Sequence, residues 1–297
     1  MDSSSGKYSK CRFVVIADSF SRDLLRKYLE SQGLLVIALD SGTPWTEIIK
    51  KVKLHHATSL VTVNCSHINS APKNELNDIQ WLNLHFGKLP DYKGKMPVQR
   101  AILNGEMEIG ITLHTIDMAK SCIGIVDVAT TPIFREDTAA SLYSRCSEIA
   151  ERMIKKHSYS LINCAILESQ RIAFESRNWS EGIPLPDRIN WEKTAHNIYN
   201  LIRAFNLPAY GAKSSLRGAG ITIWSSEIAS PFNPEVSPGM ILDIGEDMHL
   251  EVATGSGILR LLDFAFDEDI KPSPGDCFSS DKDYFSPFNE RIPVCAN

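Results

Sequence analysis

Short apolar segments alternate with helical segments through the first half of this chain, and this alternation limits the fold more than any other feature. Strands this short and this apolar are typical of a parallel sheet that helices cover on both faces. We therefore expect an N-terminal α/β domain with a doubly wound, mostly parallel sheet. The expected strands are residues 12–17, 34–39, 60–64 and 79–85, with one helix that ends at Gly33 and another over 46–52.

Two longer apolar segments complete this sheet. Residues 110–116 and 123–128 are joined by a short loop, and we expect them to pair as antiparallel strands. A helix beginning at Pro97 precedes the pair, and a long helix capped by Asp137 follows it.

The sequence pattern changes beyond about residue 170. Short strands joined by Pro-Gly, Glu-Asp and Gly-Ser-Gly turns favour a small antiparallel sheet. The expected elements are a helix over 191–205 and strands over 221–224, 239–244, 249–253 and 257–262. We expect a domain over 1–180, a connecting segment and helix over 181–206, and a β-rich domain with an irregular tail over 207–297.

Composition excludes several classes of protein. The formal charge of -5 gives no overall electrostatic reason to bind nucleic acid. The seven cysteines include no Cys-x-x-Cys pair, which fits neither a disulfide scaffold nor a zinc ribbon, and no set of residues has metal-ligand spacing. With no apolar segment of the ~18 residues that a membrane span needs, we expect a cytoplasmic protein without a membrane anchor.

The segment over 82–94 contains the best candidate site. Side chains alternate along a strand, so Asn83 and His85 share one face while Leu82 and Leu84 point into the opposite one. An amide and an imidazole are thereby directed at one point where the strand runs into a loop.

The residues around this pair resemble the signature of the formyltransferases that use 10-formyltetrahydrofolate. The signature is carried by Asn83-Leu-His85, Leu89-Pro-x-Tyr-x-Gly94, Pro97, Ala101-Ile-x-Asn-Gly105, Gly110-Ile-Thr112 and Asp117. A second block is similar to family members with a C-terminal domain: Asp187-Arg-Ile-Asn-Trp191, Ile198-Tyr-Asn-Leu-Ile-Arg203-Ala and Pro208-x-x-Gly211-Ala. The resemblance covers roughly residues 12 to 265 and implies a Rossmann-like formyltransferase fold.

The resemblance implies that an acceptor amine attacks the formyl carbon carried on N10 of the folate. It assigns Asn83 and His85 as hydrogen-bond donors to the developing oxyanion. The family's third element is an aspartate, and here Ser121 or Cys122 stands in its place. Neither is an anion at neutral pH. Asp117 and Asp127 are the nearby carboxylates, and each is read first as a turn or strand-end residue.

The resemblance also locates the ligands. The loop after the third strand would enclose the pterin of 10-formyltetrahydrofolate, which by position means Cys65, Ser66, His67 and Ile68. The acceptor would meet the loop that follows His85, with Lys88, Tyr92 and Lys93 as the candidate contacts. Positive charge at this loop favours an anionic acceptor.

We therefore expect an N-formyltransferase that acts on the primary amine of a small anionic acceptor, with an amino sugar nucleotide ranked first. An amino acid such as hydroxyornithine ranks next. Methionyl-tRNA ranks behind both, because the stretch over 40–45 is short and not basic. The alternative is a catalytically impaired family member that binds folate or a nucleotide or serves as a partner protein. The oligomeric state stays open, with a homodimer as one arrangement.

Overall fold

The computed structural model describes residues 12–65, 71–72, 75–76, 79–117, 122–162, 170–173, 187–206, 211–231 and 235–280. The chain forms two compact units. The first comprises residues 1–97, 108–132 and 143–182, and the second comprises 98–107, 133–142 and 183–297. The domain boundaries expected at 180 and 206 stay a prediction. Within the described ranges, no helix combines the length and the hydropathy needed to cross a membrane.

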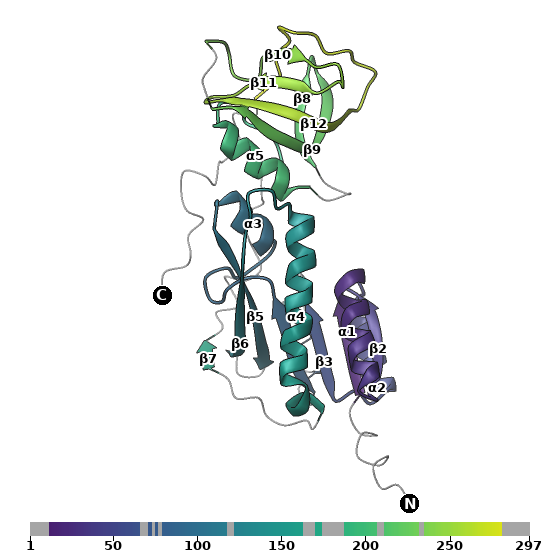
Figure 1. Ribbon diagram of the computed structural model, residues 1–297. Coiled ribbons are helices and arrows are strands. Elements are labelled where there is room, and N and C mark those ends of the chain that lie inside the picture. The colour runs from purple at the N-terminus through teal and green to yellow at the C-terminus, as the bar shows by residue number, and fades with distance from the viewer. Residues whose placement is uncertain are drawn as a thin grey trace, which may run out of the picture. The chain divides into compact units, whose positions relative to one another are not determined.

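A seven-stranded sheet forms the first unit, in the order β2-β1-β3-β4-β5-β6-β7 (Figure 1). The strands from β1 to β4 run parallel, and β5, β6 and β7 are antiparallel to their neighbours. The mixed, mostly parallel sheet expected from the sequence is confirmed. Its strands are β1 Arg12–Ala17, β2 Leu35–Asp40, β3 Ser59–Val63, β4 Gln80–His85, β5 Glu108–Asp117, β6 Cys122–Pro132 and β7 Gln170–Ala173.

Helices cover both faces of this sheet because its buried strands are apolar on both sides. On one face, Val14 and Ile16 of β1 belong to a core cluster with Ile48 and Val52 of α2. On the other face lie α1 and α4 (Figure 1), which the hydroxyls of Ser21 and Ser147 join at 2.7 Å. These helices are α1 Ser19–Ser31, α2 Trp45–Leu54 and α4 Ala139–Ile162, and α3 covers Pro97–Leu103.

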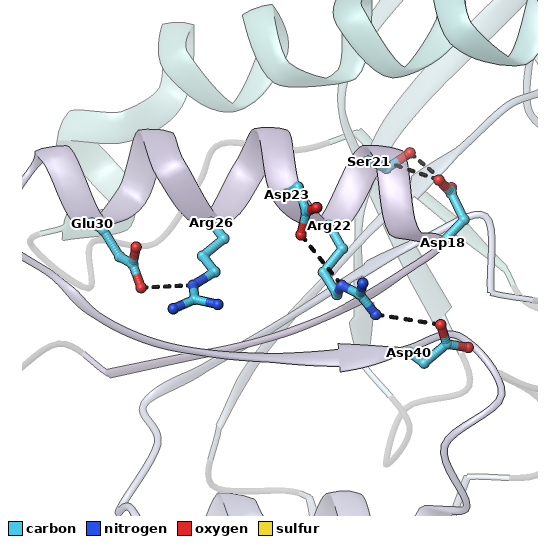
Figure 2. Close-up of polar contacts among 7 residues, drawn as sticks. All are labelled: Asp18, Ser21, Arg22, Asp23, Arg26, Glu30 and Asp40. Atoms are coloured by element: carbon cyan, nitrogen blue, oxygen red, sulfur yellow. Dashed lines mark hydrogen bonds and ion pairs between the residues drawn. The ribbon is translucent and has the colours of Figure 1, made fainter.

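The turn from β1 into α1 is fixed by a carboxylate of the chain itself (Figure 2). Asp18 accepts hydrogen bonds from the backbone N–H of Ser21 at 3.0 Å and from its hydroxyl at 2.8 Å. Aspartate is among the preferred N-cap residues because it satisfies backbone N–H groups that lack a partner within the helix. The positive end of the α1 dipole is therefore already neutralised.

A five-stranded antiparallel sheet forms the core of the second unit, in the order β10-β11-β12-β9-β8. The small antiparallel β domain expected from the sequence is confirmed. Its strands are β8 Ala212–Leu216, β9 Ala219–Ser230, β10 Ile241–Ile244, β11 Leu250–Ala253 and β12 Ile258–Phe266, and helix α5 covers Ala195–Ala204.

The Asp-Arg-Ile-Asn-Trp block has a structural role in this second unit. The ring of Trp191 is fully buried and stacks on Phe278, with centroids 5.2 Å apart. Its indole N–H donates to the hydroxyl of Ser214 on β8 at 3.0 Å. Stacking and hydrogen bonding together bury a large apolar surface without leaving the N–H unpaired. Trp191 thus joins the segment before α5 to the sheet and to the end of the described chain.

Arg203 of α5 ties the helix to the segment after β6. Its guanidinium donates to the carbonyl oxygens of Asp137 at 2.8 Å and Phe134 at 3.2 Å, and to the side-chain oxygen of Asn200 at 2.9 Å. Burial lowers the pKa of Arg203 from its ordinary value, although this guanidinium stays charged at neutral pH. The charged group satisfies three oxygens at once.

Arg203→Met should lower the free energy of unfolding by about 2–4 kcal/mol, because buried acceptors lose a charged donor. Urea denaturation followed by circular dichroism measures the change. Arg217→Met is the matched control, since Arg217 pairs with Asp276 on the exposed surface and its loss should leave stability unchanged. Equal losses in the two variants would contradict the role given to Arg203.

Candidate functional site

The carboxyl end of β4 holds the two polar residues expected at the site. Trp81, Asn83 and His85 alternate onto one face of the strand, and Trp81 belongs to the core cluster on the α2 side. The face therefore changes from apolar to polar toward the end of the strand. Asn83 and His85 are only 3% and 5% exposed, so water screens their interactions weakly.

A row of polar side chains crosses three neighbouring strands at Asn83. The strand register places Thr62 of β3 on one side of Asn83 and His114 of β5 on the other. The hydroxyl of Thr62 donates to Asn83 Oδ1 at 2.8 Å, and Asn83 Nδ2 lies 2.9 Å from His114 Nε2. His114 and Thr62 were not anticipated from the sequence, although His114 follows the Gly-Ile-Thr signature by two residues.

His114 is a neutral imidazole. Its pKa is lowered to about 3, mainly by burial and to a smaller extent by the nearby His85 ring, while the hydrogen bond to the carbonyl of Thr115 acts to raise it. Its Nδ1 lies 3.3 Å from that carbonyl oxygen. A carbonyl can only accept, so the ring proton belongs on Nδ1 and Nε2 is left as the acceptor for Asn83.

His85 is also neutral and is held by the loop that follows it. Its Nε2 lies 2.6 Å from the carbonyl oxygen of Tyr92. Burial lowers the pKa of His85 and outweighs the raising effect of this hydrogen bond. Nε2 must carry the proton in this contact, which makes Nδ1 the acceptor of the ring. The N–H expected to face an oxyanion is thus donated to Tyr92 in the structure.

The Gly-Ile-Thr signature on β5 explains how this loop is held. The hydroxyl of Thr112 donates to the carbonyl of Gly87 at 2.7 Å and accepts from the N–H of Leu89 at 3.2 Å. A Cβ on Gly110 would lie 2.6 Å from the Cβ of Lys88, so only glycine lets the loop approach β5 this closely. The backbone of the loop is therefore fixed to β5 at Gly87 and at Leu89.

Gly87 has a similar requirement on the side of His85. A Cβ there would lie 2.6 Å from the carbonyl oxygen of Tyr92 and 2.9 Å from His85 Nε2. Tyr92 is also held by its own N–H, which donates to the carbonyl of Lys88 at 2.9 Å. The side chain of Lys88 is exposed, and those of Tyr92 and Lys93 are half-buried.

The remaining candidate residues are placed less completely. Cys65 is buried in the core cluster on the α2 side. Ser66, His67, Ile68 and Ser121 lie outside the described residues, and so does the side chain of Cys122. The backbone of Cys122 begins β6 and pairs with Asp117 of β5. The roles given to these residues stay predictions.

Asp127 has partners of its own. Its carboxylate lies 2.8 Å from Lys156 Nζ and 2.9 Å from His157 Nε2, both on α4. Burial acts to raise the pKa of Asp127, but hydrogen bonds and charge from Lys156 and His157 together hold it below its ordinary value. This carboxylate fastens α4 to β6. Among the residues the structure describes, no group of three or more His, Cys, Asp or Glu is placed to hold a metal ion.

Known proteins share both the sequence pattern and the fold. Family models described as formyl transferase and as formyl transferase, C-terminal domain match residues 21–157 and 186–280. A methionyl-tRNA formyltransferase from Methylococcus capsulatus is 31% identical over 210 residues, which are 69% of this chain and 63% of that protein. The chain thus spans less than two thirds of the length of this relative.

Two solved structures have the same fold. HypX from Aquifex aeolicus, as an A392F-I419F variant, matches with a TM-score of 0.68 and 16% identity over 92% of this chain and 46% of its own. The N-formyltransferase from Helicobacter canadensis, in complex with folinic acid and dTDP-3-aminofucose, matches with a TM-score of 0.58 and 21% identity over 86% of this chain and 100% of its own. With both family models matched in order, this chain belongs to the formyltransferase family.

Proposed function

We propose that this protein transfers a formyl group from 10-formyltetrahydrofolate to the primary amine of a small anionic acceptor. The observation that carries the proposal is the pair Asn83 and His85, which share one face at the carboxyl end of β4 within a family of formyl transferases. Asn83 offers an N–H donor, and His85 offers a neutral base. Attack of an amine on a formyl carbon needs both.

Asn83 is the donor for the developing oxyanion. One N–H of its amide goes to His114, and the second makes no hydrogen bond within the described part of the chain. A preorganised donor of this kind is worth about 10²- to 10³-fold in rate. Near-complete burial of Asn83 strengthens the interaction, because little water competes for the N–H.

His85 takes up the proton that the attacking amine loses. Because Nε2–H is donated to Tyr92, Nδ1 is the basic atom, and the lowered pKa keeps it unprotonated at neutral pH. The nitrogen–carbon bond to the acceptor forms, the bond from the formyl carbon to N10 breaks, and the proton passes through His85 to N10. The carbonyl of Tyr92 orients the ring as a carboxylate would, but with only a partial negative charge.

The folate belongs in the crevice beyond the carboxyl edge of the parallel strands. In open α/β sheets ligands bind where the strand order reverses, which here is between β1 and β3. The loop over 65–68 follows β3 directly, and the N–H of Asn64 donates to the carbonyl of Leu84 at 2.9 Å, so the loop starts beside the end of β4. The start of this loop supports its assignment to the folate side, whereas Cys65 itself is buried in the core cluster.

An amino sugar nucleotide is the acceptor that the site favours. Lys88 and Lys93 stand on the loop that holds His85, with Lys88 exposed, and they supply positive charge for a diphosphate. The Helicobacter canadensis enzyme, whose complex contains dTDP-3-aminofucose, is matched over its whole length.

Methionyl-tRNA is the second candidate, favoured by the 31% identity to a methionyl-tRNA formyltransferase. Two observations weigh against it. Only four residues join β2, which ends at Asp40, to α2, which begins at Trp45, so the connection carries no basic insertion. Figure 2 shows the arginines of α1 paired with carboxylates, Arg22 with Asp40 and Arg26 with Glu30, which reduces their attraction for phosphates.

Assays with dTDP-3-aminofucose, hydroxyornithine and methionyl-tRNA as acceptors should give the highest kcat/KM for the nucleotide sugar. Asn83→Ala should lower kcat about 10²- to 10³-fold, because the oxyanion loses its donor. Asn190→Ala in the second unit is the matched control and should retain the parent kcat. A higher kcat/KM for methionyl-tRNA would transfer the proposal to that acceptor.

Ser121→Asp or Cys122→Asp should raise kcat about tenfold or more, because an anion stabilises a protonated His85 better than a neutral group does. The corresponding asparagine variants are isosteric and uncharged, and they should stay near the parent rate. A parent chain inactive with every acceptor beside an active aspartate variant would show a binding or partner protein instead of an enzyme.

Gly87→Ala should lower kcat about tenfold to hundredfold, because the new methyl group displaces the carbonyl of Tyr92 and frees the His85 ring. Gly42→Ala is the control, since its nearest contact would be Asp40 Oδ1 at an ordinary 3.6 Å. Thermal unfolding of both variants separates loss of activity from loss of fold. An unchanged kcat in Gly87→Ala would rule out orientation of His85 by Tyr92.

A further inference from the structure

Four buried side chains form a continuous hydrogen-bonded series that includes Asn83. Trp81 Nε1 lies 3.2 Å from Thr62 Oγ1, which lies 2.8 Å from Asn83 Oδ1, and Asn83 Nδ2 lies 2.9 Å from His114 Nε2. None of the four residues is more than 3% exposed. Buried polar side chains destabilise a core unless they find partners, and here each of the four side chains makes at least one hydrogen bond to another member of the series.

The chemistry of the first members fixes the direction of the series. An indole N–H can only donate, so Thr62 accepts from Trp81 and its own hydroxyl proton points elsewhere. Its acceptors are Asn83 Oδ1 at 2.8 Å and the carbonyl of Leu82 at 3.2 Å. The shorter contact places the oxygen of the Asn83 amide on the Thr62 side.

The last members give the same orientation from the other end. Thr115 offers a carbonyl oxygen to His114 Nδ1 at 3.3 Å, which requires the ring proton on Nδ1. Nε2 then has a lone pair, and only the NH₂ end of the Asn83 amide can pair with it. Because burial lowers the pKa of His114 to about 3, this neutral tautomer persists at neutral pH.

The reversed amide would be poorer in hydrogen bonds. Its oxygen would face His114 Nε2, which would then need the proton, and an unprotonated Nδ1 would be left against the carbonyl oxygen of Thr115. Two acceptors would meet in a buried place, at a cost of a hydrogen bond and without water to compensate.

We propose that Trp81, Thr62 and His114 are positioning residues that lock the amide of Asn83 in one orientation, with its second N–H directed at the reacting oxygen. The role of that N–H rests on the proposed formyl transfer. The locked orientation itself rests on the contacts of the four side chains alone. Misplacing a catalytic group by about 1 Å costs about 100-fold in rate. An amide held in one orientation should therefore increase kcat.

Kinetics of two variant pairs test the proposal in the full chain. Thr62→Val removes the hydroxyl without changing the shape and should lower kcat about tenfold to hundredfold with the KM values nearly unchanged. Thr62→Ser keeps the hydroxyl and should retain most of kcat. Thr222→Val is the matched control, because Thr222 of β9 is buried in the second unit and accepts a hydrogen bond from Lys213.

The second pair addresses His114. His114→Met removes the acceptor for Asn83 and should lower kcat to a similar degree, whereas His114→Gln offers a side-chain oxygen and should recover part of it. A merely structural role would lower thermal stability in Thr62→Val and His114→Met without separating kcat from KM. If Thr62→Val and His114→Met both retain kcat within about twofold of the parent, the proposal is overturned, since a lost catalytic donor costs far more.

Nitrogen-15 NMR of the imidazole rings tests the orientation without any assay of activity. The proposal requires His114 to carry its proton on Nδ1, with Thr62→Val and Asn83→Ala altering the Nε2 shift. A ring protonated on Nε2 overturns it. If the parent transfers no formyl group to any acceptor, the proposed function fails, while the tautomer of His114 still decides whether the amide of Asn83 is locked.

Discussion

The antiparallel pairing of β5 with β4 is the constraint on which the candidate site depends. Its register sets His114 opposite Asn83 and Thr112 opposite His85. Side chains alternate with period two, so a slip of β5 by one residue would turn His114 and Thr112 to the opposite face, away from Asn83 and His85. The parallel neighbour β3 adds Thr62 from the other side. The row of polar side chains around Asn83 is thereby assembled from strand register.

The same strand also controls the loop that orients His85. Thr112 holds the carbonyl of Gly87 and the N–H of Leu89, which returns the chain so that the carbonyl of Tyr92 meets His85. Asn83 and His85 therefore receive their orientations from β5 through two separate routes, a side-chain contact and a fixed loop. Displacement of β5 would disturb both groups together.

Sequence patterns predicted the elements that local composition determines. The strand over 12–17 matches β1 because its apolar, β-branched run favours a buried strand, and period two alone predicts that Asn83 and His85 share one face. The strands β7 and β8 were missed, since Gln-Arg-Ile-Ala and Ala-Lys-Ser-Ser-Leu have weak strand propensity and depend on their neighbours for pairing. Thr62 and His114 were missed for a related reason, because only long-range register brings them to Asn83.

The expected exchange of the family aspartate for Ser121 or Cys122 would bear on one step of the proposed reaction more than on the resting site. His85 and His114 are both neutral because burial disfavours their charged forms, and charge on one ring would repel charge on the other. A resting site of two neutral imidazoles needs no carboxylate to balance it. Only the transient imidazolium of His85 would gain from an anion, and the Tyr92 carbonyl supplies a partial charge at 2.6 Å. The Tyr92 carbonyl already orients the His85 ring, as an aspartate would. An aspartate would differ by lowering the barrier to proton transfer, because its full charge stabilises the imidazolium better.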